Sequence, residues 1–222
     1  MKLKKILGIT GVAIASVALL AACSSKSSKE ASKSSGGKET ITFATVGTTA
    51  PFSYEKDGKL TGYDVEVAKE VFKDSDKYKV KFQKTKWESV FTGLDSNNYQ
   101  MAGNNISYSA EREQKYLFSY PIGTTPAVLT VPKDSKIKKY DDIAGHSTQV
   151  VQGTSTLTQL TEFNDKHSDN PVELNYTEEN ITQMLTNVNE GKYDFKIFDA
   201  PTVNAVIKSQ NLSNLKTIDV PS

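Results

Sequence analysis

Residues 78–102 of this 222-residue chain, YKVKFQKTKWESVFTGLDSNNYQMA, indicate its fold class. Residues 78–82 alternate apolar and charged side chains, which predicts a strand. Four apolar side chains then recur at the spacing of one helical face, which predicts an amphipathic helix. They are Trp87, Val90, Phe91 and Leu94. Residues 99–102 predict another short strand, and a strand, a helix and a strand in succession favour an α/β fold.

The same alternation continues on both sides of this stretch. Upstream, residues 41–46 predict a strand, and Asp64 is the expected N-cap of a helix that runs to Lys73. Downstream, Ser109 is expected to cap a helical turn. The later expected strands are residues 127–131, 148–152, 172–176, 195–198 and 215–220, and the later expected helices begin at 154, 181 and 203. Two such series predict two lobes with parallel or mixed sheets, residues 41–131 and 132–222.

The composition excludes several classes of protein. Lysine and arginine (27) nearly balance aspartate and glutamate (26), which argues against a protein that coats nucleic acid. A single cysteine permits no internal disulfide, and two histidines leave little for a zinc cluster. The sequence contains no phosphate-binding glycine loop and no nucleophile elbow. We therefore expect no metal, no cofactor and no nucleic-acid partner.

The first 22 residues read as a signal peptide. Three lysines in residues 1–5 precede a charge-free run, residues 6–20, that is shorter than the roughly 20 apolar residues of a membrane span. The run leads into Leu-Ala-Ala-Cys at residues 20–23, which resembles a bacterial lipobox. We therefore expect cleavage before Cys23 and lipidation of its thiol. The alternative is an ordinary secretory signal that happens to contain a cysteine.

Residues 23–40 are expected to form a tether. Residues 24–38 contain seven serines and four lysines and have no apolar run that could offset the entropy of ordering them. Such a segment behaves as a flexible linker.

Segments of the following 170 residues resemble, in order, the polar amino-acid solute-binding proteins of ABC importers. They are residues 47–52 (GTTAPF) with 58–64 (GKLTGYD), residues 87–94 with 104–112 (NNISYSAER) and 118–121 (FSYP), residues 152–155 (QGTS), and residues 194–199 (DFKIFD). Each match alone is weak, but their order and spacing together are specific.

The resemblance implies the two-lobed, type II periplasmic-binding-protein-like α/β fold. It also implies a protein on the extracellular face of the cytoplasmic membrane, held there by its lipid, which captures a free amino acid and delivers it to the permease subunits of an ABC importer. On this reading the protein is not an enzyme.

The resemblance also implies two charged anchors for a zwitterionic ligand. Arg112 suits the ligand carboxylate because a planar guanidinium can bind it with two parallel hydrogen bonds. Asp199, at the end of a β-prone run, suits the ammonium group. The plainer alternatives are a surface ion pair for Arg112 and an N-cap of the following helix for Asp199.

The remaining candidates are polar groups and aromatic walls of the same site. Thr154 and Ser155 begin a helix whose free N–H groups favour a carboxylate, although capping alone also explains Thr154. The other candidates are Asn104, Asn105 and Ser107, for which a plain turn is the alternative, and Phe52 and Trp87, for which core packing is the alternative.

The sequence departs from the family pattern at two places. Thr49 stands where many members carry an aromatic side chain, which implies a more polar or roomier pocket. The family's return of the chain from lobe two to lobe one is not visible before Ser222, so the resemblance implies that lobe two is truncated and that this return is missing.

Two other functions remain open at this point. Some relatives with this fold are dehydratases, which need a general acid in the cleft; in the matched segments we expect only Glu111 to be free for that role, and to point away from Arg112. A surface adhesin or sensor with a vestigial cleft is the other alternative.

Overall fold

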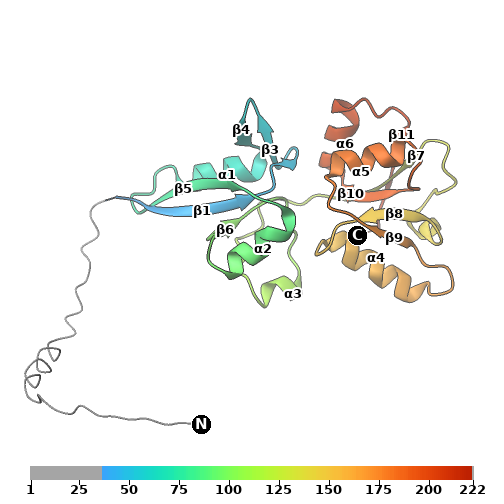
Figure 1. Ribbon diagram of the computed structural model, residues 1–222, viewed down its shortest axis with the longest axis horizontal. Coiled ribbons are helices and arrows are strands. Elements are labelled where there is room, and N and C mark those ends of the chain that lie inside the picture. The colour runs from blue at the N-terminus through green and yellow to red at the C-terminus, as the bar shows by residue number, and fades with distance from the viewer. Residues whose placement is uncertain (1–36, 222) are drawn as a thin grey trace, which may run out of the picture. The chain divides into compact units, whose positions relative to one another are not determined.

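The computed structural model describes residues 37–221 (Figure 1). The expected signal peptide, Cys23 and nearly all of the expected tether lie outside the described residues. Among the described residues, no helix is long and apolar enough to cross a membrane. The two series expected from the sequence are both present, and we refer to the elements up to α3 as lobe one and those from β7 onward as lobe two.

Lobe one is built on a parallel sheet with a small antiparallel sheet beside it. The order β5-β1-β6 forms the parallel sheet, and β2-β3-β4 forms the other. The strands are β1 (Glu39–Thr45), β2 (Thr48–Thr49), β3 (Ser53–Lys56), β4 (Lys59–Thr61), β5 (Tyr78–Lys84) and β6 (Met101–Ala102). The helices are α1 (Tyr63–Phe72), α2 (Trp87–Asp95) and α3 (Ala110–Glu113).

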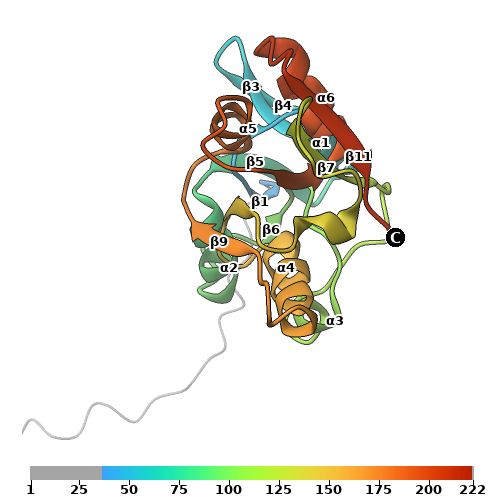
Figure 2. The same ribbon diagram turned by 90° about the vertical axis from the view of Figure 1, so that its right-hand side faces the viewer.

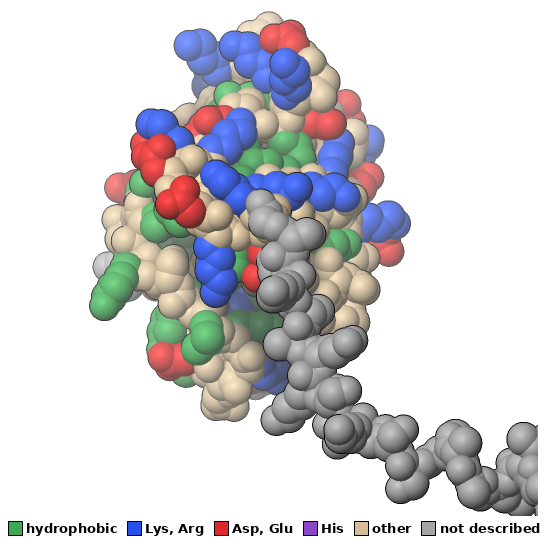
Figure 3. Space-filling view, turned by 90° about the vertical axis from the view of Figure 1, so that its left-hand side faces the viewer, with side chains coloured by type: hydrophobic (Ala, Val, Ile, Leu, Met, Phe, Trp, Pro, Cys, Tyr) green, Lys and Arg blue, Asp and Glu red, His purple; other side chains and the backbone are tan. Residues whose placement is uncertain are grey.

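Lysine and arginine side chains are prominent on the face of the molecule that Figure 3 shows.

The amphipathic pattern of α2 is confirmed, whereas the expected cap of α1 is wrong. Val90 of α2 is fully buried, as a residue on the inner helical face should be. The N-cap of α1 is Gly62, at φ 115°, and Asp64 is the second helical residue. A Cβ at Gly62 would lie 2.4 Å from the carbonyl oxygen of Phe52, so this close turn requires glycine. The carboxylate of Asp64 is thereby free for a contact elsewhere.

Lobe two contains an antiparallel sheet and a parallel pair of strands. The sheet has the order β10-β7-β11, and β8 pairs with β9. A bridge between Thr148 and Phe195 connects β8 to the segment that leads into β10. The strands are β7 (Ala127–Pro132), β8 (Ser147–Val150), β9 (Glu173–Tyr176), β10 (Lys196–Asp199) and β11 (Leu215–Asp219). The helices are α4 (Ser155–Lys166), α5 (Ile181–Asn189) and α6 (Ala200–Ser209), with a 3-10 turn at Tyr140–Ile143.

The helices of lobe two cover both faces of its strands (Figures 1 and 2). Leu129 and Val131 of β7 belong to a buried cluster with the inner face of α4. Val128, which points to the opposite face, belongs to a second cluster with α5 and α6. This alternation along one strand is the pleat of a sheet buried on both sides.

The pairing of β7 corrects the lobe boundary expected from the sequence. That boundary, between residues 131 and 132, falls inside β7, whose neighbours on both sides are strands of lobe two. The four central residues of β7 are all buried, which a strand at the centre of a covered sheet requires. The connection between the lobes therefore lies upstream, in residues 114–126.

Candidate ligand-binding site

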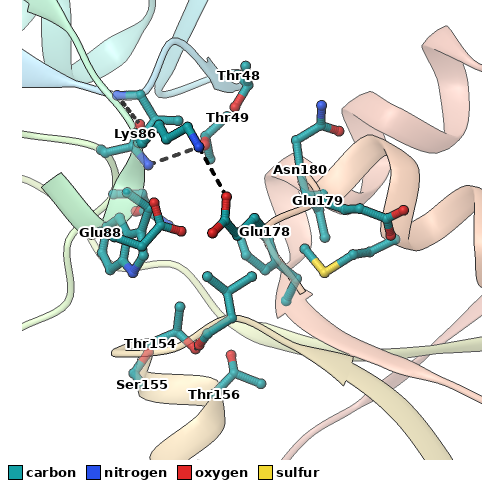
Figure 4. Close-up of a pocket in the computed structure, with 18 of the residues that line it drawn as sticks. Thr48, Thr49, Lys86, Glu88, Thr154, Ser155, Thr156, Glu178, Glu179 and Asn180 are labelled. Atoms are coloured by element: carbon teal, nitrogen blue, oxygen red, sulfur yellow. Dashed lines mark hydrogen bonds and ion pairs between the residues drawn. The ribbon is translucent and has the colours of Figure 1, made fainter. Parts of the chain in front are cut away.

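A cavity of about 550 Å³ is lined by residues of both lobes. Its walls are formed mainly by the segments that follow the strands and begin the helices, and Figure 4 shows the polar side chains that point into it. Four helices begin at this cavity: α2 at Trp87, α4 at Ser155, α5 at Ile181, and α6 directly after Asp199. Helix N-termini carry partial positive charge, so the cavity favours negatively charged ligand groups.

The structure brings nine of the ten sequence-predicted residues together at this cavity. They are Thr49, Trp87, Asn104, Asn105, Ser107, Arg112, Thr154, Ser155 and Asp199. Phe52 is the exception: it is 8% exposed, packs in lobe one next to Gly62, and is not among the lining residues. Core packing, the alternative weighed for Phe52, is therefore its role in the structure.

Arg112 is held at the cavity by contacts to both lobes. The hydroxyl of Ser109 accepts from the backbone N–H of Arg112 at 3.2 Å, which confirms Ser109 as the cap of α3. Nη1 of Arg112 donates to the carbonyl of Ser107 at 2.7 Å, and Nη2 donates to the carbonyl of Gly153, in lobe two, at 2.9 Å. Burial lowers the pKa of Arg112. The guanidinium keeps further N–H donors for a ligand, and no carboxylate pairs with it in the described residues.

Two aromatic rings lie beside the guanidinium of Arg112, and one of them, Trp87, lines the cavity. The guanidinium carbon of Arg112 lies 5.2 Å from the ring centre of Phe91 and 5.9 Å from that of Trp87. Trp87 in turn donates its indole N–H to the carbonyl of Gln152, in lobe two, at 3.0 Å. These contacts restrict the orientation of the guanidinium.

Asp199 is half-buried at the end of β10. Its Oδ1 accepts from the hydroxyl of Thr125 at 2.8 Å, and its Oδ2 accepts from the side-chain amide of Asn105 at 2.6 Å. Burial raises the pKa of Asp199, and the two hydrogen bonds oppose this effect. Asp199 occupies the N-cap position of α6, but its side chain makes no capping hydrogen bond. The carboxylate is therefore directed to the cavity and not to the helix.

Asn104 and Thr154 line the cavity, but their side chains are hydrogen-bonded to other residues of the protein. Oδ1 of Asn104 accepts from the backbone N–H of Val46 at 3.2 Å, and its amide donates to the hydroxyl of Thr49 at 3.2 Å. The hydroxyl of Thr154 accepts from the backbone N–H of Leu157, which confirms its expected capping role. These two residues shape the walls of the cavity.

Sequence reasoning missed five charged residues that line the cavity. They are Lys84, Lys86, Glu88, Glu178 and Glu179. The expectation that only Glu111 of the matched segments is free for the role of a general acid is therefore wrong, because Glu88 lies in one of these segments and lines the cavity. Glu178 and Glu179 follow the end of β9, a position at which α/β proteins often place ligand groups, and this rule could have found them.

Lys86 and Glu178 form an ion pair at the cavity. Nζ of Lys86 lies 3.1 Å from Oε2 of Glu178, and the two side chains point toward one another in Figure 4. This hydrogen bond, together with the charges of Glu178 and Glu88, raises the pKa of Lys86. The pair joins lobe one to lobe two.

Comparison with known proteins places most of the chain in one family. Residues 41–170 match the family described as bacterial extracellular solute-binding proteins, family 3. The L-cystine-binding protein TcyA of Bacillus subtilis is 34% identical over 181 residues, 81% of this chain and 64% of TcyA. A probable amino-acid ABC transporter-binding protein of Haemophilus influenzae is 37% identical over 109 residues, 48% of this chain and 42% of the relative. The chain thus spans less than two thirds of the length of these two relatives.

Solved structures share the fold. One is 61% identical, with a TM-score of 0.83 over 84% of this chain and 78% of the other. It comes from work on the molecular and structural basis of glutathione import in Gram-positive bacteria via GshT and the cystine ABC importer TcyBC of Streptococcus mutans. An ancestral arginine-binding protein bound to arginine is 21% identical, with a TM-score of 0.73 over 81% of this chain and 78% of the other. The expected two-lobed α/β fold is confirmed.

Proposed function

Because the chain belongs to the bacterial extracellular solute-binding proteins of family 3, we propose that it captures a small zwitterionic ligand between its lobes and delivers it to an ABC importer. The observation that carries this proposal is the meeting of Arg112, from lobe one, and Asp199, from lobe two, at one cavity. A ligand that contacts both residues stabilises the arrangement in which the lobes meet, by its differential affinity for that arrangement.

The two anchors match the two charges of an α-amino acid head group. Arg112 binds the carboxylate through its free N–H donors, supported by the N-terminus of α4 at Ser155. Asp199 binds the ammonium group. Both charged groups of the protein are partly removed from water, so each contact with the ligand is stronger than it would be on the surface.

The proposed ligand is an amino acid or amino-acid derivative of the cystine or glutathione type. The 61% identity to a structure from work on glutathione import and a cystine importer supports this choice, as does the similarity to an L-cystine-binding protein. The cavity of about 550 Å³ also offers more room than a small amino acid needs. Thr49, in place of an aromatic side chain, contributes to this room.

We place the protein on the extracellular face of the cytoplasmic membrane, held there by lipid on Cys23 and delivering to the importer's permease subunits. This placement rests on the Leu-Ala-Ala-Cys sequence at residues 20–23 and on the family. We propose that the protein is a binding protein and not an enzyme, because the two relatives compared above, which are 34% and 37% identical, are named as binding proteins.

Isothermal titration of wild type and Arg112→Ala with cystine, glutathione and the common amino acids tests the proposal. Loss of one partner from a desolvated charged contact costs about 2–5 kcal/mol, so Arg112→Ala is expected to weaken binding at least about 30-fold. Lys115→Ala, an exposed position just after α3, is the matched control. Circular dichroism establishes that both variants fold. An Arg112→Ala protein that binds within about threefold of wild type would show that Arg112 is not the carboxylate anchor.

A further inference from the structure

The cavity carries a second pair of opposite charges besides Arg112 and Asp199. Lys86 is the N-cap residue of α2, and Glu178 lies just before α5, 92 positions further along the chain. Their side chains meet at 3.1 Å, one from each lobe (Figure 4). A single zwitterionic head group requires one cation and one anion, so it leaves this second pair without a partner in the ligand.

Two of the other missed charges at the cavity, Lys84 and Glu179, have partners within their own lobe. Lys84 forms an ion pair with Glu55 in lobe one. Glu179 accepts hydrogen bonds from the side-chain amides of Gln149, at 2.7 Å, and Asn187, at 2.9 Å, in lobe two. Lys86 is therefore the lysine of this cavity whose ion pair spans the two lobes.

The ammonium group of Lys86 can change partners at little cost. The side chains of Lys86 and Glu178 are 75% and 71% exposed. Ion pairs exposed to this extent contribute little to stability, because water solvates both charges once they separate. A carboxylate delivered by a bound ligand can therefore replace Glu178 as the partner of Lys86.

The volume of the cavity also favours a ligand that is larger than one amino-acid head group. A volume of about 550 Å³ corresponds to roughly 18 water-sized groups at about 30 Å³ each. One amino-acid head group at Arg112 and Asp199 fills only part of that space. The remainder is available to a ligand that continues beyond its head group and ends in another charge.

We propose that Lys86 anchors a second carboxylate, at the distal end of an extended ligand whose zwitterionic head is held by Arg112 and Asp199. The chemical class is a peptide-like amino-acid derivative with two carboxylates, of which glutathione is the test case. The inference rests on the proposed function. Glu178 holds Lys86 in place while the distal carboxylate is absent and competes with that carboxylate during binding.

Masking the distal carboxylate tests the inference directly. Titration of the intact protein with glutathione and with its glycine monoethyl ester compares ligands that differ at this group. Wild type is expected to prefer glutathione about threefold to fivefold, because Lys86 is exposed. Lys86→Met is expected to abolish this preference, and Lys86→Arg is expected to restore it in part. Lys79→Met, an exposed lysine of β5 outside the cavity, is the matched control and is expected to keep the full preference.

The variant Glu178→Gln distinguishes a ligand subsite at Lys86 from an ion pair that only connects the two lobes. If Glu178 competes with the ligand, Glu178→Gln binds glutathione at least as tightly as wild type and keeps the preference. If Lys86→Met and Glu178→Gln both weaken binding, each by the same factor for glutathione and for its ester, the inference is wrong. If wild type binds cystine or free amino acids but not glutathione, the inference about Lys86 is wrong, whereas the proposed function is unaffected. Wild type that binds none of these ligands would overturn both.

Discussion

Asn105 donates its side-chain amide to Oδ2 of Asp199 at 2.6 Å, across 94 positions of sequence and from one lobe to the other. The backbone of Asn105 is left-handed, at φ 53°, and its N–H donates to Oδ2 of Asp64 at 2.6 Å. Asp64 is buried in α1, and burial raises its pKa while the hydrogen bond from Asn105 opposes this effect. The carboxylate of Asp64 thus holds the turn that directs the amide of Asn105 to the proposed ammonium anchor.

The left-handed turn at Asn105 predicts unequal effects of two substitutions. Asn105→Gly keeps the backbone angle available, whereas Asn105→Ala places a Cβ in a conformation that disfavours it by about 1 kcal/mol or more. Both variants lose the amide, so their difference isolates the backbone. Urea unfolding is expected to find Asn105→Ala less stable than Asn105→Gly by about 1 kcal/mol. Equal free energies of unfolding would contradict this account of the turn.

Asp199→Asn is expected to discriminate between ligands with and without an α-amino group. The amide cannot neutralise an ammonium group, so glutathione or cystine should bind at least about 30-fold more weakly, about 2 kcal/mol. The deaminated analogue of glutathione should change far less. Titration of both ligands measures the ratio, and an equal loss for both would remove Asp199 from the role of ammonium anchor.

Lys196 predicts a pH-dependent stability. Its side chain is buried and donates to the carbonyl of Gln149 at 2.8 Å, and burial lowers its pKa to about 8 from 10.5. Below pH 8 the ammonium is charged in both folded and unfolded chains, so the full cost of burying the charge is present. Between about pH 8 and 10.5 the folded state binds fewer protons than the unfolded state, so this contribution to stability rises with pH, by on the order of 3 kcal/mol.

Urea unfolding of wild type and Lys196→Met at several pH values measures this effect. Lys196→Met is expected to be the more stable protein at pH 7, and its advantage is expected to shrink as the pH rises from about 8 to 10.5. Other titrating groups are common to both proteins and cancel in the difference. A difference that does not vary with pH would mean that Lys196 keeps an ordinary pKa in the folded protein.

Cys23→Ala tests the proposed anchor, which lies outside the described residues. Wild type is expected in the membrane fraction with an N-terminus at the lipidated Cys23, and Cys23→Ala is expected to stay unprocessed or to enter the medium. Two acyl chains hold a protein on a membrane far more firmly than a single chain does. Mass spectrometry of the mature N-terminus decides the matter, since a start at any other residue excludes lipidation at Cys23.

Elements whose signals are local could be predicted from the sequence alone. The apolar face of α2 and the caps Ser109 and Thr154 depend on residues within one or two helical turns, and the structure has each of them as predicted. Arg112 and Asp199 were found by their place in motifs and by the strand-end rule, and both line the cavity.

Which of these elements meet depends on contacts between residues that are far apart in the sequence. The apolar run of β7 suits either lobe, and its position between β10 and β11 depends on strands far along the chain. Asp64 has the residue type of a cap, yet the close turn at Gly62 leaves its carboxylate for Asn105, 41 positions away. The strand-end rule could have pointed to Glu178, but no local pattern predicts its pairing with Lys86, because a contact between lobes depends on chain packing and not on the spacing of neighbouring residues.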